Sequence, residues 1–293
     1  MIELKYHCNY LSNYYNNLTF YIDNNIKYVM QLGTYNGEDS FNKICYNLKN
    51  SEIILVEANN KHNKDIIENY KNIGNNNKII LINKAIVLGN YEKDTIDFYN
   101  YENEQQSSII KDGSVVHENS NYKILKVNTI KFNNILKNHN FYNLELLMID
   151  LEGLDYELLM DIDFSLIPNL KYLFFEGYHI DKKQKYIINN ENAYFYVFGK
   201  KFKLLIDKLV ENNYVLKIVT PDFYELLFEK VNITNDNYID YLIDTKNIEY
   251  YKNNKNNKNN ENSKNNYIFC QLTKLKTYFN LKLIEKYSFN FEK

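Results

Sequence analysis

Apolar runs of strand length that end abruptly in polar or acidic residues constrain this chain most strongly. The run Leu144–Ile149 leads into Asp150-Leu151-Glu152-Gly153, and similar runs end at Gly33, at Glu57 and at Glu176-Gly177. Ligands of open α/β sheets bind outside the carboxyl ends of the strands. The pattern therefore predicts a largely parallel sheet that carries a polar ligand site along one edge.

Segments with the helical spacing of apolar residues alternate with these runs and with a further strand at 78–83. We expect helices at 40–48, 61–70, 130–137, 158–166 and 202–211. Strands that alternate with helices at this spacing are typical of βαβ units with right-handed crossovers. The fold class is therefore α/β with a mostly parallel central sheet flanked by helices. Strands at 214–219 and 267–272 are expected to be antiparallel at its C-terminal end.

The remaining segments are less regular. Residues 1–25 read as an N-terminal cap, and 26–293 as a single domain. Residues 95–99 alternate like an edge strand, and 102–120 form a long polar loop, which in a compact domain is more often functional than idle. Residues 252–266 are Asn/Lys repeats without an apolar residue, so we expect a disordered surface insert there.

Composition narrows the class of protein. The 293 residues are 45% hydrophobic, carry a net charge of -2 and include no arginine, which makes nucleic acid an unlikely partner. No apolar run approaches the ~20 residues of a membrane span, and the N-terminus lacks the apolar segment of a signal peptide. The three cysteines are scattered, as in reduced proteins. We expect a soluble cytoplasmic protein without a membrane partner; its oligomeric state cannot be read from the sequence.

The turn that follows the first strand, Gly33 to Gly37, is a candidate ligand loop. A glycine directly after a buried strand permits a tight turn and lets a ligand approach the backbone, and we expect Gly37 to open a helix whose N–H groups suit a polar ligand. Glu57 closes the second strand, where it could accept both ribose hydroxyls of an adenosine. Lys84 and Ala85 would then border the adenine. An ordinary strand-to-helix turn with a solvated Glu57 is the alternative.

Acidic residues at neighbouring strand ends, Asp150, Glu152 and Glu176, with His179 just beyond, are the candidate catalytic groups. One of them could take the proton of an acceptor hydroxyl, or the three acids could hold a hard divalent cation. As alternatives, Glu152 caps a helix that begins near Leu154, and His179 is an ordinary loop histidine. Asp155 reads as a partner of that helix's dipole.

Several motifs occur in an order and spacing similar to those of one known family: Gln31-Leu32-Gly33-Thr34-Tyr35-Asn36-Gly37, Val56-Glu57-Ala58-Asn59, Asn83-Lys84-Ala85-Ile86, Ser107-Ser108, Met148-Ile149-Asp150-Leu151-Glu152-Gly153 and Phe175-Glu176-Gly177-Tyr178-His179. Over residues 26–231 the chain resembles the FkbM family of S-adenosylmethionine-dependent methyltransferases. The resemblance implies a Rossmann-like class I methyltransferase fold and O-methyl transfer, often to sugar hydroxyls.

The resemblance also implies residue roles. Glycines 33 and 37 would lie beside the methionine part of S-adenosylmethionine, Glu57 on its ribose, and Asp150 near the reacting methyl. The implied cofactor-binding set is Gln31, Gly33, Thr34, Gly37, Glu57, Ala58, Lys84, Ala85 and Asp150. Ser107 and Ser108 match the family's serine pair and, with His117 of the long loop, are substrate candidates. Gln31 stands where many members carry an acid, and Thr34-Tyr35 replaces the usual small residues.

The predicted function is therefore an S-adenosylmethionine-dependent O-methyltransferase that acts on a sugar hydroxyl of a glycan or nucleotide-sugar. Two alternatives stay open: a catalytically inactive interaction module of the same fold, and an RNA methyltransferase. A dehydrogenase fits less well, because the glycines at 33 and 37 lack the tighter G-x-G-x-x-G spacing.

Overall fold

The computed structural model describes residues 22–71, 73, 76–102, 104–111, 121–177, 180–181, 184–188, 191–195, 199–219, 225–234, 274–275, 277–283 and 285–286. The described residues fall into two compact units, a larger one up to Phe175 and a smaller one from Glu176 onward. The boundary lies inside strand β8 (Tyr172–Glu176).

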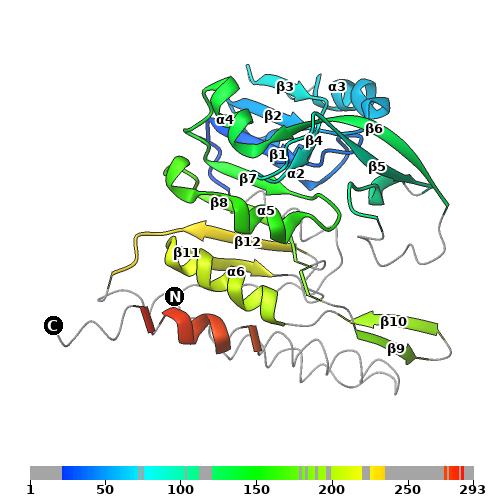
Figure 1. The fold of residues 1–293 in the computed structure, drawn as a ribbon. Helices are drawn as coiled ribbons and strands as arrows, with labels where there is room; N and C mark the ends of the chain where they lie inside the picture. The colour runs from blue at the N-terminus through cyan, green and yellow to red at the C-terminus, as the bar shows by residue number, and fades with distance from the viewer. Residues whose placement is uncertain are drawn as a thin grey trace, which may run out of the picture. The chain divides into compact units, whose positions relative to one another are not determined.

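The larger unit is built on a parallel sheet with the strand order β8-β7-β1-β2-β3 (Figure 1). Its strands are β1 (Tyr28–Leu32), β2 (Glu52–Val56), β3 (Lys78–Ile82), β7 (Leu146–Ile149) and β8 (Tyr172–Glu176). Leu32 pairs with both Val56 and Ile149, and Ile149 pairs with Phe175. The next residues along the chain, Gly33, Glu57, Asp150 and Glu176, therefore lie at one edge of the sheet. This confirms the predicted polar edge.

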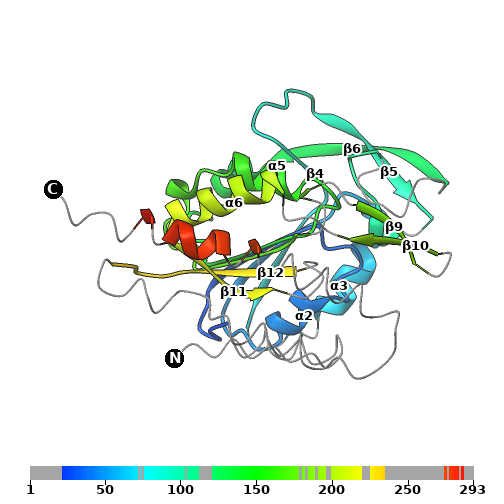
Figure 2. The same cartoon turned by 90° about the horizontal axis from the view of Figure 1, so that it is seen from below.

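Helices connect the strands: α2 (Ser40–Cys45), η1 (Asn60–His62), α3 (Asn63–Lys71), α4 (Phe132–His139), α5 (Asp155–Asp161) and the turn η4 (Phe164–Leu166). Figure 2 shows α2 and α3 on one side of the sheet and α5 on the other. The prediction of one helix over 158–166 is wrong. Ile162 adopts an extended conformation (ψ 126°), which ends α5, and Asp163 then caps the separate turn η4.

A second, three-stranded sheet with the order β4-β6-β5 belongs to the same unit. It consists of β4 (Ala85–Val87), β5 (Thr95–Tyr101) and β6 (Tyr122–Lys131), and the turn η2 (Glu104–Gln106) follows β5. The predicted edge strand at 95–99 is confirmed. The predicted helix over 130–137 begins later, at Phe132, because Ile130 and Lys131 still belong to β6. Strand β6 was not predicted, since it is mostly exposed and its polar residues obscure the apolar pattern.

The smaller unit contains an antiparallel hairpin of β9 (Gln184–Ile188) and β10 (Glu191–Phe195), helix α6 (Lys200–Glu211), and the antiparallel pair β11 (Tyr214–Val219) and β12 (Glu225–Lys230). The expected antiparallel strand at 214–219 is confirmed, and its partner is β12. The strand expected at 267–272 and the insert at 252–266 lie outside the described residues, as does most of the N-terminal segment. No helix within the described ranges is long and apolar enough to cross a membrane.

Asp181 determines where α6 begins. Its carboxylate accepts hydrogen bonds from the backbone N–H groups of Gly199 (2.8 Å), Lys201 (3.2 Å) and Phe202 (3.0 Å). We expect Asp181→Ala to lower the free energy of unfolding by about 1–2 kcal/mol, because the first turn of α6 loses its cap. Urea denaturation measures this. Lys200→Ala, on an exposed residue of the same turn, is the control; equal midpoints for the two variants would contradict the capping role.

Candidate functional site

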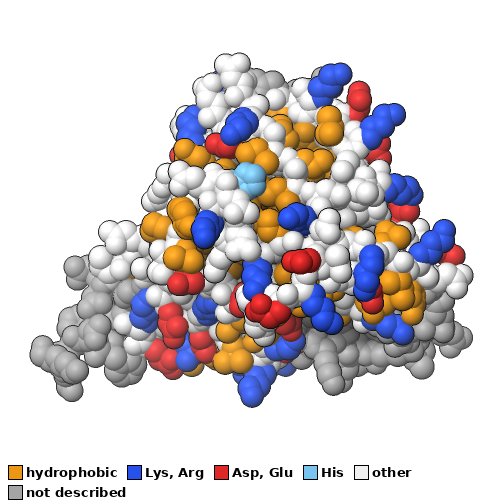
Figure 3. All heavy atoms as spheres, turned by 45° about the horizontal axis from the view of Figure 1, so that its top comes forward, with side chains coloured by type: hydrophobic (Ala, Val, Ile, Leu, Met, Phe, Trp, Pro, Cys, Tyr) orange, Lys and Arg blue, Asp and Glu red, His pale blue; other side chains and the backbone are white. Residues whose placement is uncertain are grey.

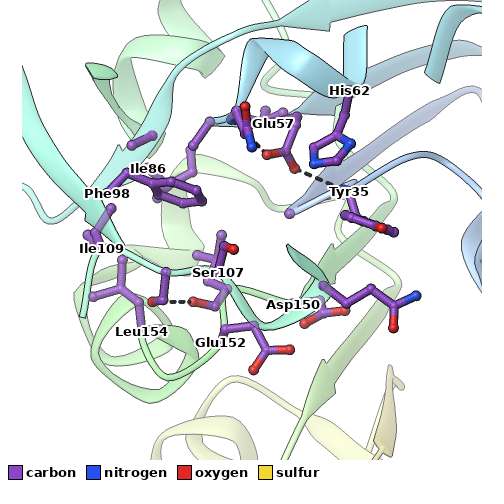
Figure 4. Close-up of a pocket in the computed structure, with 18 of the residues that line it drawn as sticks. Tyr35, Glu57, His62, Ile86, Phe98, Ser107, Ile109, Asp150, Glu152 and Leu154 are labelled. Atoms are coloured by element: carbon purple, nitrogen blue, oxygen red, sulfur yellow. Dashed lines mark hydrogen bonds between the residues drawn. The ribbon is translucent and has the colours of Figure 1, made fainter. Parts of the chain in front are cut away.

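A pocket lies at the polar edge of the parallel sheet of the larger unit. Its cavity volume is about 70 Å³, and the empty space of the whole hollow, open solvent included, is about 630 Å³. Figure 4 shows Glu57, His62 and Tyr35 on one side, Asp150 and Glu152 opposite them, and apolar side chains along a third side. The lining residues that the sequence predicted are Gly33, Glu57, Ala58, Lys84, Ala85, Ser107, Ser108, Asp150 and Glu152.

Gly33 holds the end of β1 against the loop that follows β7. Its φ of +82° lies in the left-handed region, and a Cβ atom added there would lie 1.7 Å from the carbonyl oxygen of Asp150. The backbone N–H of Asp150 donates to Leu32 (2.9 Å), and that of Gly33 donates to Val56 (2.9 Å). From the sequence, we expected a glycine here so that a ligand could approach the backbone. The close contact between the main chains of Gly33 and Asp150 requires a glycine more strictly.

The expectation that Gly37 opens a helix is wrong. Helix α2 begins at Ser40, and Asp39 occupies the cap position, where its carboxylate accepts from the N–H of Asn42 at 2.9 Å. Gly37 has a φ of +79°, and its N–H donates to the carbonyl of Thr34 at 2.9 Å. Neither Thr34 nor Gly37 is among the pocket-lining residues. Both shape the turn, and their cofactor contacts stay predictions.

Gln31 lies behind this turn rather than on the pocket surface, with an exposed fraction of 0%. Its amide nitrogen donates to the Gly33 carbonyl (3.2 Å) and to the Asp39 carboxylate, and its oxygen accepts from the Tyr70 hydroxyl (3.2 Å). Burial raises the pKa of Asp39. The amide of Gln31 thus joins the turn to α2 and α3, a role distinct from the predicted contact with a cofactor.

Glu57 extends from the end of β2 with an exposed fraction of 7%. One carboxylate oxygen accepts from the N–H of Tyr35 and the other from the N–H of Asn59, both at 2.8 Å. Burial raises the pKa of Glu57 to about 7, although these N–H groups favour the ionised form. Each carboxylate oxygen has a second lone pair, so both can accept a ligand hydroxyl as well.

The wall beside Glu57 joins the two sheets. The rings of Tyr35 and His62 lie 4.6 Å apart. In this wall, Asn59 donates to Asn100 of β5 at 2.9 Å, and Lys61 forms an ion pair with Glu104 at 2.6 Å. The burial of His62 lowers its pKa. The sequence-based prediction missed these residues; the polar run directly after Glu57 was the signal that could have identified them.

Apolar side chains form the adjoining side of the pocket: Ile86, Phe98, Ile109 and Leu154 (Figure 4). Ser107 and Ser108, predicted to contact substrate, fasten this side in place. Ser108 is 2% exposed, and its hydroxyl donates to the carbonyl of Leu151 at 3.2 Å. The Ser107 hydroxyl accepts from the N–H of Tyr101 at 3.2 Å. His117 lies outside the described residues.

The loop from Asp150 to Leu154 presents two carboxylates to the pocket. Glu152 has a φ of +51°, and Leu154 occupies the cap position of α5, so the interpretation of Glu152 as the helix cap is wrong. Asp155, with an exposed fraction of 0%, accepts from the N–H groups of Leu151 (3.1 Å) and Gly153 (3.2 Å). Asp155 therefore does more than pair with the helix dipole.

Glu176 ends β8 beside this loop and is 5% exposed. One carboxylate oxygen from each of Asp150, Glu152 and Glu176 lies within 4.8 Å of the other two. Three oxygen donors at this spacing are the kind of set that a hard divalent cation prefers. The structure thus brings the three predicted acids together, whereas the predicted His179 lies outside the described residues.

The solved structures that are similar to this chain include two distant ones. The structure of M. capricolum TrmK in complex with S-adenosyl-homocysteine is 14% identical and has a TM-score of 0.39; the match covers 94% of this chain and 99% of that one. A protein of the NADB-Rossmann superfamily from Streptococcus agalactiae is 11% identical, also with a TM-score of 0.39, over 92% and 98% of the two chains. No curated protein matches this chain.

The family comparison is decisive. The model described as the methyltransferase FkbM domain matches residues 31–216, which include every described residue of the pocket and the whole parallel sheet beyond the first residues of β1. The match covers more than half of the chain. The chain therefore belongs to the FkbM methyltransferase family and is an S-adenosylmethionine-dependent methyltransferase.

Proposed function

We propose that this methyltransferase transfers the methyl group to a sugar hydroxyl of a glycan or nucleotide-sugar. The observation that carries the proposal is the convergence of Gly33, Glu57, Asp150 and Glu152 on one pocket. The carboxylate of Glu57 suits ribose hydroxyls. The carboxylates of Asp150 and Glu152 opposite suit the positively charged sulfonium and the acceptor hydroxyl that loses its proton. The sugar acceptor itself is inferred from the family resemblance.

The residues of the pocket fit S-adenosylmethionine. Glu57 would accept the ribose hydroxyls, and Ile86, Phe98 and Leu154, beside Lys84 and Ala85, would enclose the adenine. Asp150 and Glu152 would face the sulfonium side. When bound, the cofactor supplies an electrophilic methyl group.

The acceptor hydroxyl needs a group that takes up its proton, since a neutral hydroxyl is a poor nucleophile. We assign this role to the carboxylates of Asp150 and Glu152, with Glu176 beside them. The alternative to a carboxylate base is a divalent cation held by these three acids. Such a cation would bind and polarise the sugar oxygen. The protein's own contribution is then orientation: the acceptor oxygen would be held in line with the methyl carbon and the carbon–sulfur bond that breaks, and the carboxylate beside it would take the hydroxyl proton.

Asp150→Asn tests the proposal. We expect kcat to fall at least 100-fold because one of the two carboxylates assigned to the acceptor's proton loses its charge. Turnover of S-adenosylmethionine is measured against a panel of sugars and nucleotide-sugars, with and without divalent cation and chelator. Asp97→Asn, on β5 in an exposed ion pair with Lys126, is the control. Turnover with RNA but with no sugar would favour the RNA alternative, and cofactor binding without turnover on any acceptor would favour the inactive module.

We keep the other expectations as part of the proposal: a small-molecule or glycan substrate, a cytoplasmic location, and neither membrane nor nucleic acid as partner. On the face shown in Figure 3, lysine and acidic side chains are interspersed. Neutralisation of RNA phosphates requires clustered positive charge. We therefore expect this face to bind RNA weakly. Strong salt-dependent RNA binding would count against this part of the proposal.

A further inference from the structure

The segment that carries Asp150 and Glu152 is held from two sides at a single residue, Leu151. The N–H group of Leu151 donates to one carboxylate oxygen of Asp155 (3.1 Å), and its carbonyl accepts from the Ser108 hydroxyl (3.2 Å). The second oxygen of Asp155 accepts from the N–H of Gly153 (3.2 Å). Asp155 and Ser108 thus fix the main chain on both sides of Glu152.

This fixation is needed because the segment adopts an unfavourable conformation. Glu152 has a φ of +51° and Gly153 a φ of +111°, both outside the regions that residues with side chains prefer. Such conformations persist where the surrounding structure over-determines them. Asp155 is fully buried, and each of its two oxygens accepts a hydrogen bond from one of these backbone N–H groups, which lowers the cost of burying the carboxylate.

We propose that Asp155 is a positioning residue for methyl transfer. Ser108 supports the same segment through the carbonyl of Leu151. Asp155 does not line the pocket; it acts by holding Asp150 and Glu152 in the orientation that faces the ligand. This inference rests on the proposed assignment of those two carboxylates to the reaction. It changes the interpretation of both residues, since the sequence alone suggested a dipole partner and a substrate contact.

Asp155→Asn removes one acceptor while it preserves the size of the side chain, because an amide nitrogen cannot accept from a backbone N–H. Asp163→Asn is the control for the same chemical change at an exposed cap. Asp163 also accepts from a backbone N–H, that of Ser165 at 2.9 Å, but it starts η4 away from the pocket lining. Ser108→Ala removes the other arm, together with the hydrogen bond that the Ser108 hydroxyl accepts from the N–H of Ile110 at 3.1 Å.

Two measurements separate positioning from simple stabilisation. The first is kcat with the acceptor found in the sugar panel. The second is the ratio of the dissociation constants of S-adenosylmethionine and S-adenosylhomocysteine, measured by calorimetry well below the melting temperature. The two compounds differ by the methyl group and its positive charge, so displaced carboxylates change the ratio, whereas general loosening of the pocket weakens both equally.

We expect Asp155→Asn to lower kcat at least 30-fold and to shift the ratio at least threefold, Ser108→Ala to change both in the same direction by less, and Asp163→Asn to change neither. Unchanged kcat and ratio in folded Asp155→Asn would overturn the inference. If circular dichroism shows that Asp155→Asn does not fold, Ser108→Ala decides by the same criteria. If wild-type protein methylates no sugar, the proposed function fails, and the ratio still decides the inference.

Discussion

Gly33→Ala is expected to abolish cofactor binding, with at least a 100-fold loss of affinity for S-adenosylmethionine, and to destabilise the fold by more than about 4 kcal/mol. The added methyl group would lie 1.7 Å from the carbonyl oxygen of Asp150 in a backbone conformation of φ +82°. Main-chain atoms at both ends of that contact cannot rotate away as a flexible side chain can. The end of β1 and the loop after β7 must therefore separate.

Gly37→Ala is the matched control for this prediction. Gly37 has nearly the same φ, +79°, but its added methyl group would meet the Tyr70 ring at 3.1 Å rather than a main chain. We expect a loss of about 1–2 kcal/mol from the left-handed conformation alone, and affinity within tenfold of wild type. Urea denaturation and calorimetry give both quantities. Equal losses in the two variants would show that the contact with Asp150 is unimportant.

Glu57→Gln is expected to weaken the binding of S-adenosylmethionine by 10- to 100-fold. Hydrogen bonds to a charged group contribute about 1.5–3 kcal/mol each, and the substitution removes the charge that the ribose hydroxyls would meet. One backbone N–H, of Tyr35 or Asn59, would also face an amide N–H₂ group instead of an oxygen. Glu104→Gln, at another acid of the pocket lining, keeps Glu57 intact and is the control for a general change of charge.

The pH dependence of Glu57 gives a further signature, with opposite signs for stability and for binding. Burial raises the pKa of Glu57 to about 7 in the folded protein, from 4.5. The raised pKa contributes stability that is fully present below the unfolded value and is lost as the pH rises through 7. The loss amounts to about 3 kcal/mol at most. Ribose hydroxyls donate more strongly to the ionised carboxylate, so affinity rises over the same interval.

Both trends are measurable in one series of buffers from pH 5 to pH 8. Calorimetry in buffers of different ionisation enthalpy should show that a proton is released when the cofactor binds below pH 7. Glu57→Gln should flatten the stability curve between pH 4.5 and pH 7 and remove the proton release. A wild-type affinity that stays constant across this interval would exclude Glu57 as the group that meets the ribose.

The sequence predicted the parallel sheet and its polar edge because both depend on local patterns. Apolar runs that stop at Gly33, Glu57 and Asp150 are visible within a few residues, and parallel pairing then aligns the strand ends. Strand β6 was missed because its exposed face carries polar residues in most positions.

The remaining site residues depend on contacts that no local pattern encodes. The ring of His62 lies beside Tyr35, Ser108 bonds to Leu151 from 43 residues away, and Asp155 turns back onto its own loop. Gln31 shows the same difficulty in reverse. The family resemblance suggested a ligand contact for this residue of β1, whereas the folded chain directs its amide toward Asp39 and Tyr70.

The two sheets of the larger unit are separated by only Asn83 and Lys84, between the end of β3 and the start of β4. The amide of Asn83 donates to the carbonyl of Glu57 at 2.8 Å, and Lys84 lines the pocket, so this short link is part of the pocket wall. A bound nucleoside would contact both sheets near the residues that link them. Occupancy should therefore raise the melting temperature of both sheets together, by the mass-action term that the ligand concentration sets.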